Sequence, residues 1–296
     1  MAVDNEIRME TITLNGVRLC YFERRVQQTN KPTLLFVHAT GFHGRVWDRV
    51  IESFPDHHVL AMEQRGHGRS EKVIIRHWRE FGDDIAGFVE ALGLSNVIGI
   101  GHSMGAHGLV DGAAKCKVFA RLVLLDPVIT GPDTFSDRQT VALEGLHPAA
   151  RRRNHFASPE EMVKRLLPKS SFGLFEPRIL DDYCRYGLLP AASGGYELAC
   201  PPDVEASVYM TARTNGAIYQ SVRSLEIPVM VMRARARTSE GTVPDFSSSP
   251  TWPGLADEFK HGREMHLEDC SHFIPMEVPD RVVEVVQAEI GAWSTA

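Results

Sequence analysis

The stretch Asn96-Val97-Ile98-Gly99-Ile100-Gly101-His102-Ser103-Met104-Gly105-Ala106 decides the fold of this chain. Its first half is an apolar run typical of a strand, and its second half contains Gly-x-Ser-x-Gly followed by small residues. This pattern predicts a nucleophile elbow, in which a serine lies on a sharp turn from a strand into a helix. Glycines two residues either side of Ser103 suit such a turn, because it leaves no room for a Cβ atom. So short a pattern also arises by chance, so the remaining chain must supply the other parts of a site.

Length and composition indicate a globular core that carries a sizeable insertion, or one large domain. The chain has 296 residues, of which 43% are hydrophobic and 24% charged. Its net charge of −6 argues against nucleic acid as a partner, because phosphate binding requires a basic surface. The five cysteines show no C-x-x-C spacing, which predicts reduced thiols in a cytoplasmic protein without a zinc site. We find neither a signal peptide nor about 18 consecutive apolar residues, so no membrane span is expected.

Strands and helices alternate on both sides of the elbow. Residues 9–25 alternate around an Asn-Gly pair, which predicts a hairpin. The short apolar runs are typical of strands covered on both faces, and amphipathic spacing predicts helices between them; the strands are expected at 32–38, 59–62, 97–101 and 121–127, and the helices at 77–92 and from the elbow to about 117. The alternation predicts a mostly parallel central sheet with helices on both faces.

The alternation stops after Pro127 and resumes only near residue 223. The intervening segment reads as helical and shows no buried strand; its helices are expected at 158–167, 176–186 and 203–213. Two further strands and a final helix follow, at 228–232, 263–267 and 279–293. We therefore predict an α/β core domain of residues 1–126 and 223–296, into which residues 127–222 are inserted as an α-helical cap.

A serine hydroxyl becomes a nucleophile only beside a base, usually an imidazole that a carboxylate orients. His272 follows the last strand and precedes the last helix, which makes it the candidate base. Two carboxylates can complete a triad: Asp126 ends the strand after the elbow helix, and Asp245 lies in the irregular loop after strand 228–232. Both keep the chain order Ser, acid, His that elbow serines use. We favour Asp126, which Pro127 holds at a strand end, and keep Asp245 as the alternative.

The oxyanion that forms in acyl transfer needs two preorganised N–H donors. Met104 directly follows the serine at the start of a helix and can supply one of them. The loop Ala39-Thr40-Gly41, at the end of the first parallel strand, can supply the other.

On these motifs the chain resembles enzymes of the α/β-hydrolase fold, of the Ser-nucleophile esterase type with a helical cap. The motifs are His-x-x-Gly-Phe at 38–42, Glu-x-Arg-Gly-x-Gly-x-Ser at 63–70, Gly-His-Ser-Met-Gly at 101–105 and Ser-His-Phe at 271–273. The resemblance implies that Ser103 is the nucleophile and His272 the general base, with the Thr40 and Met104 amides as the oxyanion hole.

Two departures from the family pattern affect this assignment. The oxyanion loop carries His38-Ala39 where the family usually has His-Gly, so one donor could be displaced by one residue. Strand 228–232 is followed by Arg233-Ala234-Arg235, at the place where the fold commonly carries its acid.

Side chains around these motifs suggest a substrate pocket and its supports. The pocket candidates are Phe42, His107, Tyr183 and Tyr186, and five of the six tyrosines fall within the predicted cap. A tyrosine has an apolar body and a polar tip, which suits a substrate of mixed polarity. His38 is expected to brace the oxyanion loop, His102 to pack beside the serine, and Arg151-Arg152-Arg153 to form a solvated face.

Together these features predict a serine hydrolase that cleaves a carboxylic ester or lactone through an acyl-enzyme. We expect a small-molecule substrate, no metal and no cofactor; a homodimer is compatible with the sequence. The same residues also serve C–C bond hydrolases, thioesterases, and lyases or ligand receptors on this fold, and these alternatives stay open. An aspartate nucleophile is disfavoured, because Ser103 occupies that position.

A dinucleotide site is the competing hypothesis from another class. Gly99-x-Gly101-x-x-x-Gly105, with Asp126 after the next strand, imitates its fingerprint. The third glycine comes one position late, however, and the hypothesis leaves His272 and the 38–42 loop without a role, so we disfavour it.

Overall fold

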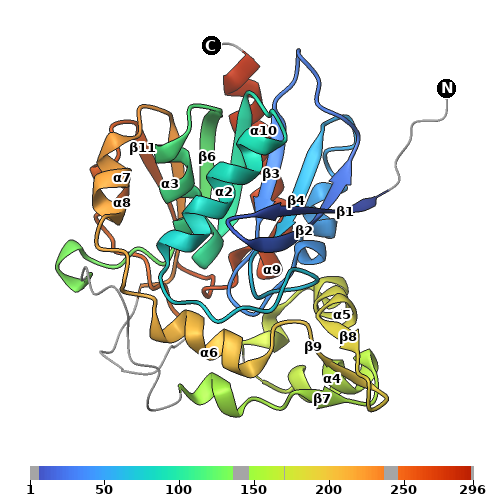
Figure 1. Ribbon diagram of the computed structural model, residues 1–296. Coiled ribbons are helices and arrows are strands. Elements are labelled where there is room, and N and C mark those ends of the chain that lie inside the picture. The colour runs from blue at the N-terminus through green and yellow to red at the C-terminus, as the bar shows by residue number, and fades with distance from the viewer. Residues whose placement is uncertain (1–6, 136–146, 170, 237–245, 295–296) are drawn as a thin grey trace.

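An eight-stranded sheet lies at the centre of the computed structural model, which describes residues 7–135, 147–169, 171–236 and 246–294 (Figure 1). In chain order the strands of this sheet are β1 (Arg8–Leu14), β2 (Val17–Arg24), β3 (Thr33–Val37), β4 (Val59–Glu63), β5 (Val97–His102), β6 (Phe119–Leu125), β10 (Val229–Ala234) and β11 (Gly262–Leu267). Across the sheet they follow the order β1-β2-β4-β3-β5-β6-β10-β11. β1 with β2 and β2 with β4 pair antiparallel, and the remaining pairs are parallel. The predicted mostly parallel α/β sheet is confirmed.

Helices cover both faces of the sheet, as the alternation predicts. One face carries α2 (Arg79–Ala91), α3 (Met104–Lys115), α7 (Ile218–Ser224) and α8 (Leu255–Glu258). The other carries η1 (Gly44–Trp47), α1 (Asp48–Ile51), α9 (Ile274–Glu277) and α10 (Pro279–Ser294). Strands β3 to β6 are buried along most of their length, which explains why their sequences are mostly apolar.

The predicted hairpin is present at β1 and β2. Leu14 pairs with Val17, so the turn consists of Asn15 and Gly16 alone. Both turn residues have positive φ, at 51° and 75°, as a two-residue hairpin turn of type I′ requires.

The segment between β6 and β10 carries helices and, in addition, a small sheet. Besides α7, its described helices are η2 (Pro132–Thr134), η3 (Pro148–Arg151), α4 (Pro159–Leu166), η4 (Phe172–Leu174), α5 (Pro177–Tyr186) and α6 (Pro202–Met210). The small sheet is antiparallel and consists of β7 (His155–Phe156), β8 (Leu188–Pro190) and β9 (Tyr196–Leu198). The sequence did not predict these strands, because two or three residues are too few to show an alternating pattern.

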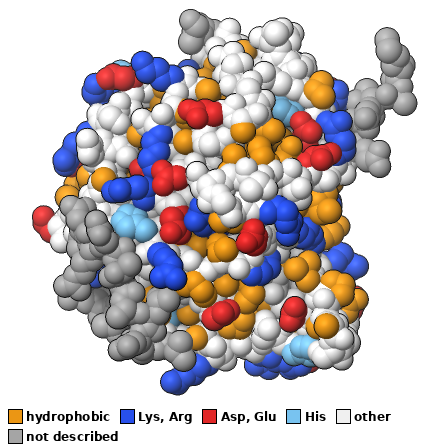
Figure 2. All heavy atoms as spheres, in the orientation of Figure 1, with side chains coloured by type: hydrophobic (Ala, Val, Ile, Leu, Met, Phe, Trp, Pro, Cys, Tyr) orange, Lys and Arg blue, Asp and Glu red, His pale blue; other side chains and the backbone are white. Residues whose placement is uncertain are grey.

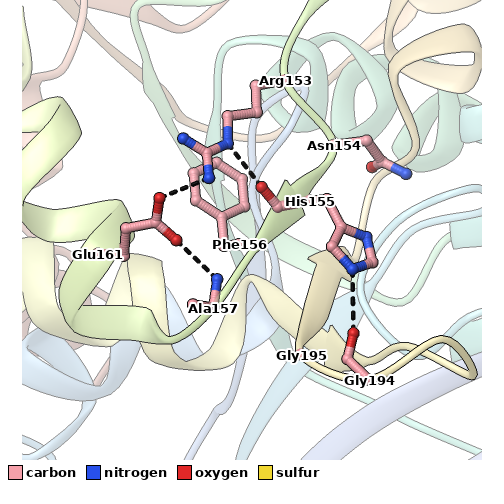
Figure 3. Close-up of a pocket in the computed structure, with 8 residues that line it drawn as sticks. All are labelled: Arg153, Asn154, His155, Phe156, Ala157, Glu161, Gly194 and Gly195. Carbon is pink, nitrogen blue, oxygen red and sulfur yellow. Dashed lines mark hydrogen bonds and ion pairs between the residues drawn. The ribbon is translucent and has the colours of Figure 1, made fainter.

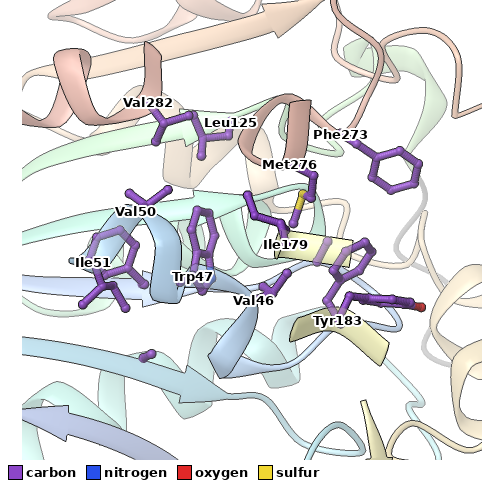
Figure 4. Close-up of a cluster of buried hydrophobic side chains, with 14 of the residues drawn as sticks. Val46, Trp47, Val50, Ile51, Leu125, Ile179, Tyr183, Phe273, Met276 and Val282 are labelled. Atoms are coloured by element: carbon purple, nitrogen blue, oxygen red, sulfur yellow. The ribbon is translucent and has the colours of Figure 1, made fainter. Parts of the chain in front are cut away.

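An apolar cluster joins this segment to the sheet. Ile179 and Tyr183 of α5 lie beside Val46 of η1 and beside Phe273 and Met276 near α9 (Figure 4). Burial of side chains of this size stabilises a fold by roughly 1.5–3 kcal/mol each. The segment between β6 and β10 is therefore anchored on the core. Its last helix, α7, packs on the helices that cover the sheet. The boundaries of the predicted cap stay a prediction.

The carboxyl ends of the parallel strands meet at one edge of the sheet, which is why loops from distant parts of the chain come together there. In Figure 1, α4, α5 and α6 lie along this edge. Open α/β sheets bind their ligands beyond the carboxyl ends of the strands, so this edge is the place to look for a site.

The surface shows charges of both signs. On the face drawn in Figure 2, acidic and basic side chains are interspersed between apolar ones. Within the ranges that the structure describes, no helix combines the length and apolar composition that crossing a membrane requires.

Close approach of α3 to β3 should make Gly105 sensitive to any added side chain. A Cβ atom at Gly105 would lie 2.5 Å from the carbonyl oxygens of Val37 and His38. We expect Gly105→Ala to lower the free energy of unfolding by about 1–3 kcal/mol, because neither carbonyl can move freely. The control is Gly291→Ala in α10, where the added Cβ meets no atom within 4 Å, and it should leave stability unchanged or raise it. Urea denaturation measures both variants; equal losses would contradict this close contact.

Candidate active site

Ser103 lies on a strained turn between β5 and α3. Its φ of 58° and ψ of −117° are rare for a residue with a side chain, and such a conformation costs about 1–3 kcal/mol. The turn is tight enough that a Cβ atom at Gly101 would lie 2.8 Å from the Cα atom of Ala106. The two glycines that flank the serine therefore have the steric role that the Gly-x-Ser-x-Gly pattern predicts.

A hydrogen-bonded relay joins Ser103, His272 and Asp126. The distance from His272 Nε2 to Ser103 Oγ is 2.9 Å, and that from His272 Nδ1 to Asp126 Oδ2 is 2.6 Å. A carboxylate can only accept, so His272 Nδ1 carries the proton and Nε2 is left to accept from the serine hydroxyl. All three side chains are buried, with Ser103 and His272 each 4% exposed. This arrangement can make the hydroxyl a nucleophile.

The second oxygen of Asp126 is held by three donors. The backbone N–H of Ala234 donates to Oδ1 at 3.0 Å, and the hydroxyls of Ser249 and Thr251 donate to it at 2.5 and 3.2 Å. These bonds fix the plane of the carboxylate toward His272. Sequence reasoning missed Ser249 and Thr251, although the run of hydroxyl residues at 247–251 was the signal that could have shown them.

Asp245, the alternative acid, lies outside the described residues. The next residue, Phe246, lies against the imidazole. Its ring stacks on that of His272 at 6.0 Å between centroids, and the backbone N–H of His272 donates to the Phe246 carbonyl at 3.1 Å. The choice of Asp126 as the acid stays a prediction, which its hydrogen bond to His272 supports.

The predicted oxyanion donors belong to two segments in direct contact. The hydroxyl of Thr40 donates to the sulfur of Met104 at 3.4 Å. His38 braces the loop: its Nε2 accepts from the N–H of Gln64 at 3.0 Å, so its Nδ1 donates to the Ala39 carbonyl at 2.8 Å. Met104 is the first residue of α3, where a backbone N–H has no acceptor within the helix. The Thr40 side chain thus contacts that of the residue directly after the serine, while the role of the two backbone amides as an oxyanion hole stays a prediction.

The sequence matches the family described as "Alpha/beta hydrolase family" over residues 34–285. The chain belongs to this family. Lipase LipV of Mycobacterium tuberculosis is 24% identical to this α/β hydrolase over 275 residues, which cover 90% of this chain and 97% of the lipase.

Two solved structures show how closely the fold of this α/β hydrolase is shared. E-2-(acetamidomethylene)succinate hydrolase superposes with a TM-score of 0.73 at 18% identity, over 96% of this chain and 98% of that one. The enol-lactonase from Burkholderia xenovorans gives a TM-score of 0.67 at 19% identity, over 94% and 98% of the two chains. At such identities the structural likeness establishes the fold alone.

Of the predicted pocket residues, Phe42 and Tyr183 lie together. Their ring centroids are 4.7 Å apart, and Phe42 also packs against Phe273, next to His272, at 5.8 Å. Among the described residues no ring contact joins Tyr186 to this pair; the guanidinium of Arg45 lies over the Tyr186 ring at 4.2 Å instead. The α/β hydrolase thus has an aromatic wall beside its imidazole, to which Tyr186 does not contribute in this arrangement.

His102 and His107 are buried supports of the elbow. His102 Nε2 donates to the carbonyl of His272 at 2.8 Å, which ties the histidine loop to β5. His107 Nδ1 donates to the Val128 carbonyl at 2.9 Å, and its Nε2 accepts from Asn215 at 3.1 Å. Both ring nitrogens of His107 are therefore engaged by the protein, which leaves it little to offer a substrate.

The expectation that Arg151-Arg152-Arg153 is a solvated face is wrong for Arg152. Its guanidinium donates to Glu205 at 2.7 Å and to the hydroxyl of Tyr183 at 2.8 Å. Three segments of the helical insertion converge at this cluster, so no local pattern in the sequence could have paired them.

A shallow hollow of about 730 Å³ on the small sheet is separate from the relay (Figure 3). Arg153, His155, Phe156 and Glu161 line it, together with the turn at Gly194 and Gly195. None of its lining residues contacts Ser103 or His272 in the part of the chain that the structure describes, so it is not the place where the serine would act.

Buried neutral histidines should make this α/β hydrolase less stable in acid. Burial lowers the pKa of His43 to about 3 and those of His67 and His107 to about 4, from 6.5. Below pH 6.5 these histidines are therefore protonated in the unfolded chain, whereas in the folded chain they stay neutral down to about pH 4. The free energy of unfolding thus has its full value above pH 6.5 and decreases below it. Each histidine should contribute a loss of about 1–2 kcal/mol by about pH 5. Urea denaturation across this range measures the free energy of unfolding as a function of pH. This free energy should fall less steeply with decreasing pH in His67→Gln than in the wild type. An equal pH dependence in both proteins would contradict the assignment.

Proposed function

We propose that this α/β hydrolase is a serine hydrolase that cleaves a carboxylic ester or lactone through an acyl-enzyme on Ser103. The observation that carries the proposal is the relay, in which one imidazole bonds to the serine hydroxyl at 2.9 Å and to a buried carboxylate at 2.6 Å. Each part of this relay has a role in acyl transfer that its chemistry allows.

In acylation, Ser103 Oγ attacks the substrate carbonyl carbon while His272 Nε2 takes its proton. The amides of Thr40 and Met104 stabilise the negative charge that forms on the carbonyl oxygen. The imidazolium that results is stabilised by Asp126, which stays ionised. When the tetrahedral intermediate collapses, His272 gives its proton to the leaving alkoxide, so an alcohol departs and the acyl group remains on Ser103.

Deacylation repeats these steps with water. His272 Nε2 takes a proton from the water as its oxygen attacks the acyl carbon, and then returns that proton to Ser103 Oγ as the ester bond breaks. The acid product leaves, and the serine hydroxyl is restored. His272 is therefore the only acid–base group that the two steps require. In each step it first takes a proton as a base and then gives it back as an acid.

Esters and lactones are the substrates that this machinery serves most simply, because an alkoxide leaving group needs only one proton. Relatives described as a lipase and as an enol-lactonase support this class by analogy. Thioesters and C–C bonds beside a ketone require the same three groups and are the second choice. We also propose that residues 127–222 act as a cap over the carbonyl site and select a small-molecule substrate.

An activated phosphonate should test the nucleophile. We expect one phosphonyl group per chain, on Ser103, with complete loss of p-nitrophenyl acetate turnover. Ser103→Ala should neither be labelled nor retain turnover, with kcat reduced by several orders of magnitude. The control is Ser224→Ala, which removes an exposed hydroxyl that only bonds the Ser221 carbonyl. Labelling of another residue, or full activity of Ser103→Ala, would disprove the proposal.

Parallel amide substitutions should identify the acid. In Asp126→Asn the amide NH2 group would face His272 Nδ1 and favour the tautomer that cannot accept from Ser103, so kcat should fall by about 10⁴. Asp245→Asn should change kcat little. Circular dichroism checks that each variant is folded. A large loss only in Asp245→Asn would exchange the two assignments, and small losses in both would show that another group orients the imidazole.

A further inference from the structure

A cluster of charged and phenolic side chains lies over the oxyanion loop. A Cβ atom at Gly41 would be 3.1 Å from Oε1 of Glu205 and 3.5 Å from Nη1 of Arg152. Gly41 directly follows Thr40, whose hydroxyl contacts Met104 beside the nucleophile. The mechanism above uses neither the arginine nor the glutamate, although both are held next to the position where the substrate carbonyl would bind.

A second chain of contacts leads from this cluster to the imidazole. The ring of Tyr209, on α6, packs against Phe246 at 6.3 Å, and Phe246 stacks on His272 at 6.0 Å. The charges of Glu205 and Arg152 both act on the Tyr209 hydroxyl, whose pKa burial raises well above its ordinary value, so it stays a neutral donor. The cluster therefore flanks the relay from two directions: through Gly41 and through Tyr209.

Arg152 is the accessible member of the ion pair. Its side chain is 24% exposed, whereas that of Glu205 is 9% exposed. Within the described residues, its bonds to Glu205 and Tyr183 use two of the five N–H groups that a guanidinium carries. Both partners also fix its plane, so the remaining donors are preorganised for a second acceptor.

The charge balance near Arg152 favours an anion. Lys169 is close enough for the arginine's charge to lower its pKa, after the larger effect of burial. Glu205 is the acid that pairs with Arg152. Arg152 and Glu205 balance each other in charge, so it is the positive charge of Lys169 that would favour a carboxylate over an ammonium group here.

We propose that Arg152 is a specificity-determining residue that binds a carboxylate of the substrate. The substrate class is then a short ester or lactone that carries a second, ionised carboxyl group. This inference rests on the proposed hydrolase function and adds to it the charge of the substrate. A purely structural role for the Arg152–Glu205–Tyr183 cluster predicts something different, namely equal losses for all substrates when the arginine is replaced.

The test compares monomethyl succinate with methyl butanoate, two methyl esters of equal chain length, by pH-stat titration. The wild type should prefer the anionic ester. Arg152→Gln should reduce kcat/KM for monomethyl succinate about ten- to a hundredfold, mainly through KM, and leave methyl butanoate nearly unchanged. Glu205→Gln frees the arginine's charge and should raise kcat/KM for the anionic ester alone. The matched control is Arg153→Gln, since Arg153 pairs with Glu161 on the outer face and should not alter the ratio.

Three outcomes would overturn the inference: no preference in the wild type, equal losses for both esters in Arg152→Gln, or a preference for a cationic ester that Glu205→Gln removes. In each of them Ser103-dependent turnover of methyl butanoate leaves the hydrolase proposal standing. If neither ester is cleaved, calorimetric titration with succinate decides the matter without turnover. Binding that is present in the wild type and lost in Arg152→Gln supports the carboxylate site, and absence of binding in the wild type rejects it.

Discussion

The backbone conformation of Ser103 is the constraint on which the site depends. A residue with a side chain adopts φ near 58° only where its surroundings hold it there. Here β5 ends in the middle of the sheet, and α3 starts so close to the end of β3 that a Cβ atom at Gly105 would lie 2.5 Å from the carbonyl oxygens of Val37 and His38. Hydrogen bonds of the Ser103 backbone to Leu125 and Val128 fix the turn further. These contacts fix the backbone from which the hydroxyl reaches His272 Nε2.

The parallel sheet then brings the other groups to the same edge. Asp126 follows β6, the neighbour of β5, and His272 follows β11, so neither needs a long side chain to reach its partner. Two layers of support surround them: Ser249 and Thr251 bond to Asp126, and His102 bonds to the carbonyl of His272. Such supports set the orientation that a proton relay needs, since each distance in it is near 3 Å or below.

The segment between β6 and β10 contributes a hydrogen-bonded polar cluster where the sequence predicted solvated arginines and aromatic pocket residues. Arg152, Tyr183 and Glu205 come from three separate elements, yet they form one ion-pair and hydrogen-bond cluster over Gly41. A buried ion pair is seldom a net source of stability, because desolvation of its charges offsets much of their attraction. The position of this cluster beside Gly41 is the observation behind the specificity role that we propose for Arg152.

The sequence by itself determined the parts that depend on local pattern: the hairpin at Asn15-Gly16, the buried strands, the elbow at Ser103 and the family to which the chain belongs. Those features follow from periodicity and from glycines that a tight turn requires, so they can be read along the chain. Only the tertiary structure decided which groups meet. That Asp126 reaches His272, that Ser249 and Thr251 brace it, and that Arg152 pairs with Glu205 all depend on contacts between residues far apart in sequence. Short strands such as β7 to β9 also escaped prediction, because tertiary pairing rather than local pattern creates them.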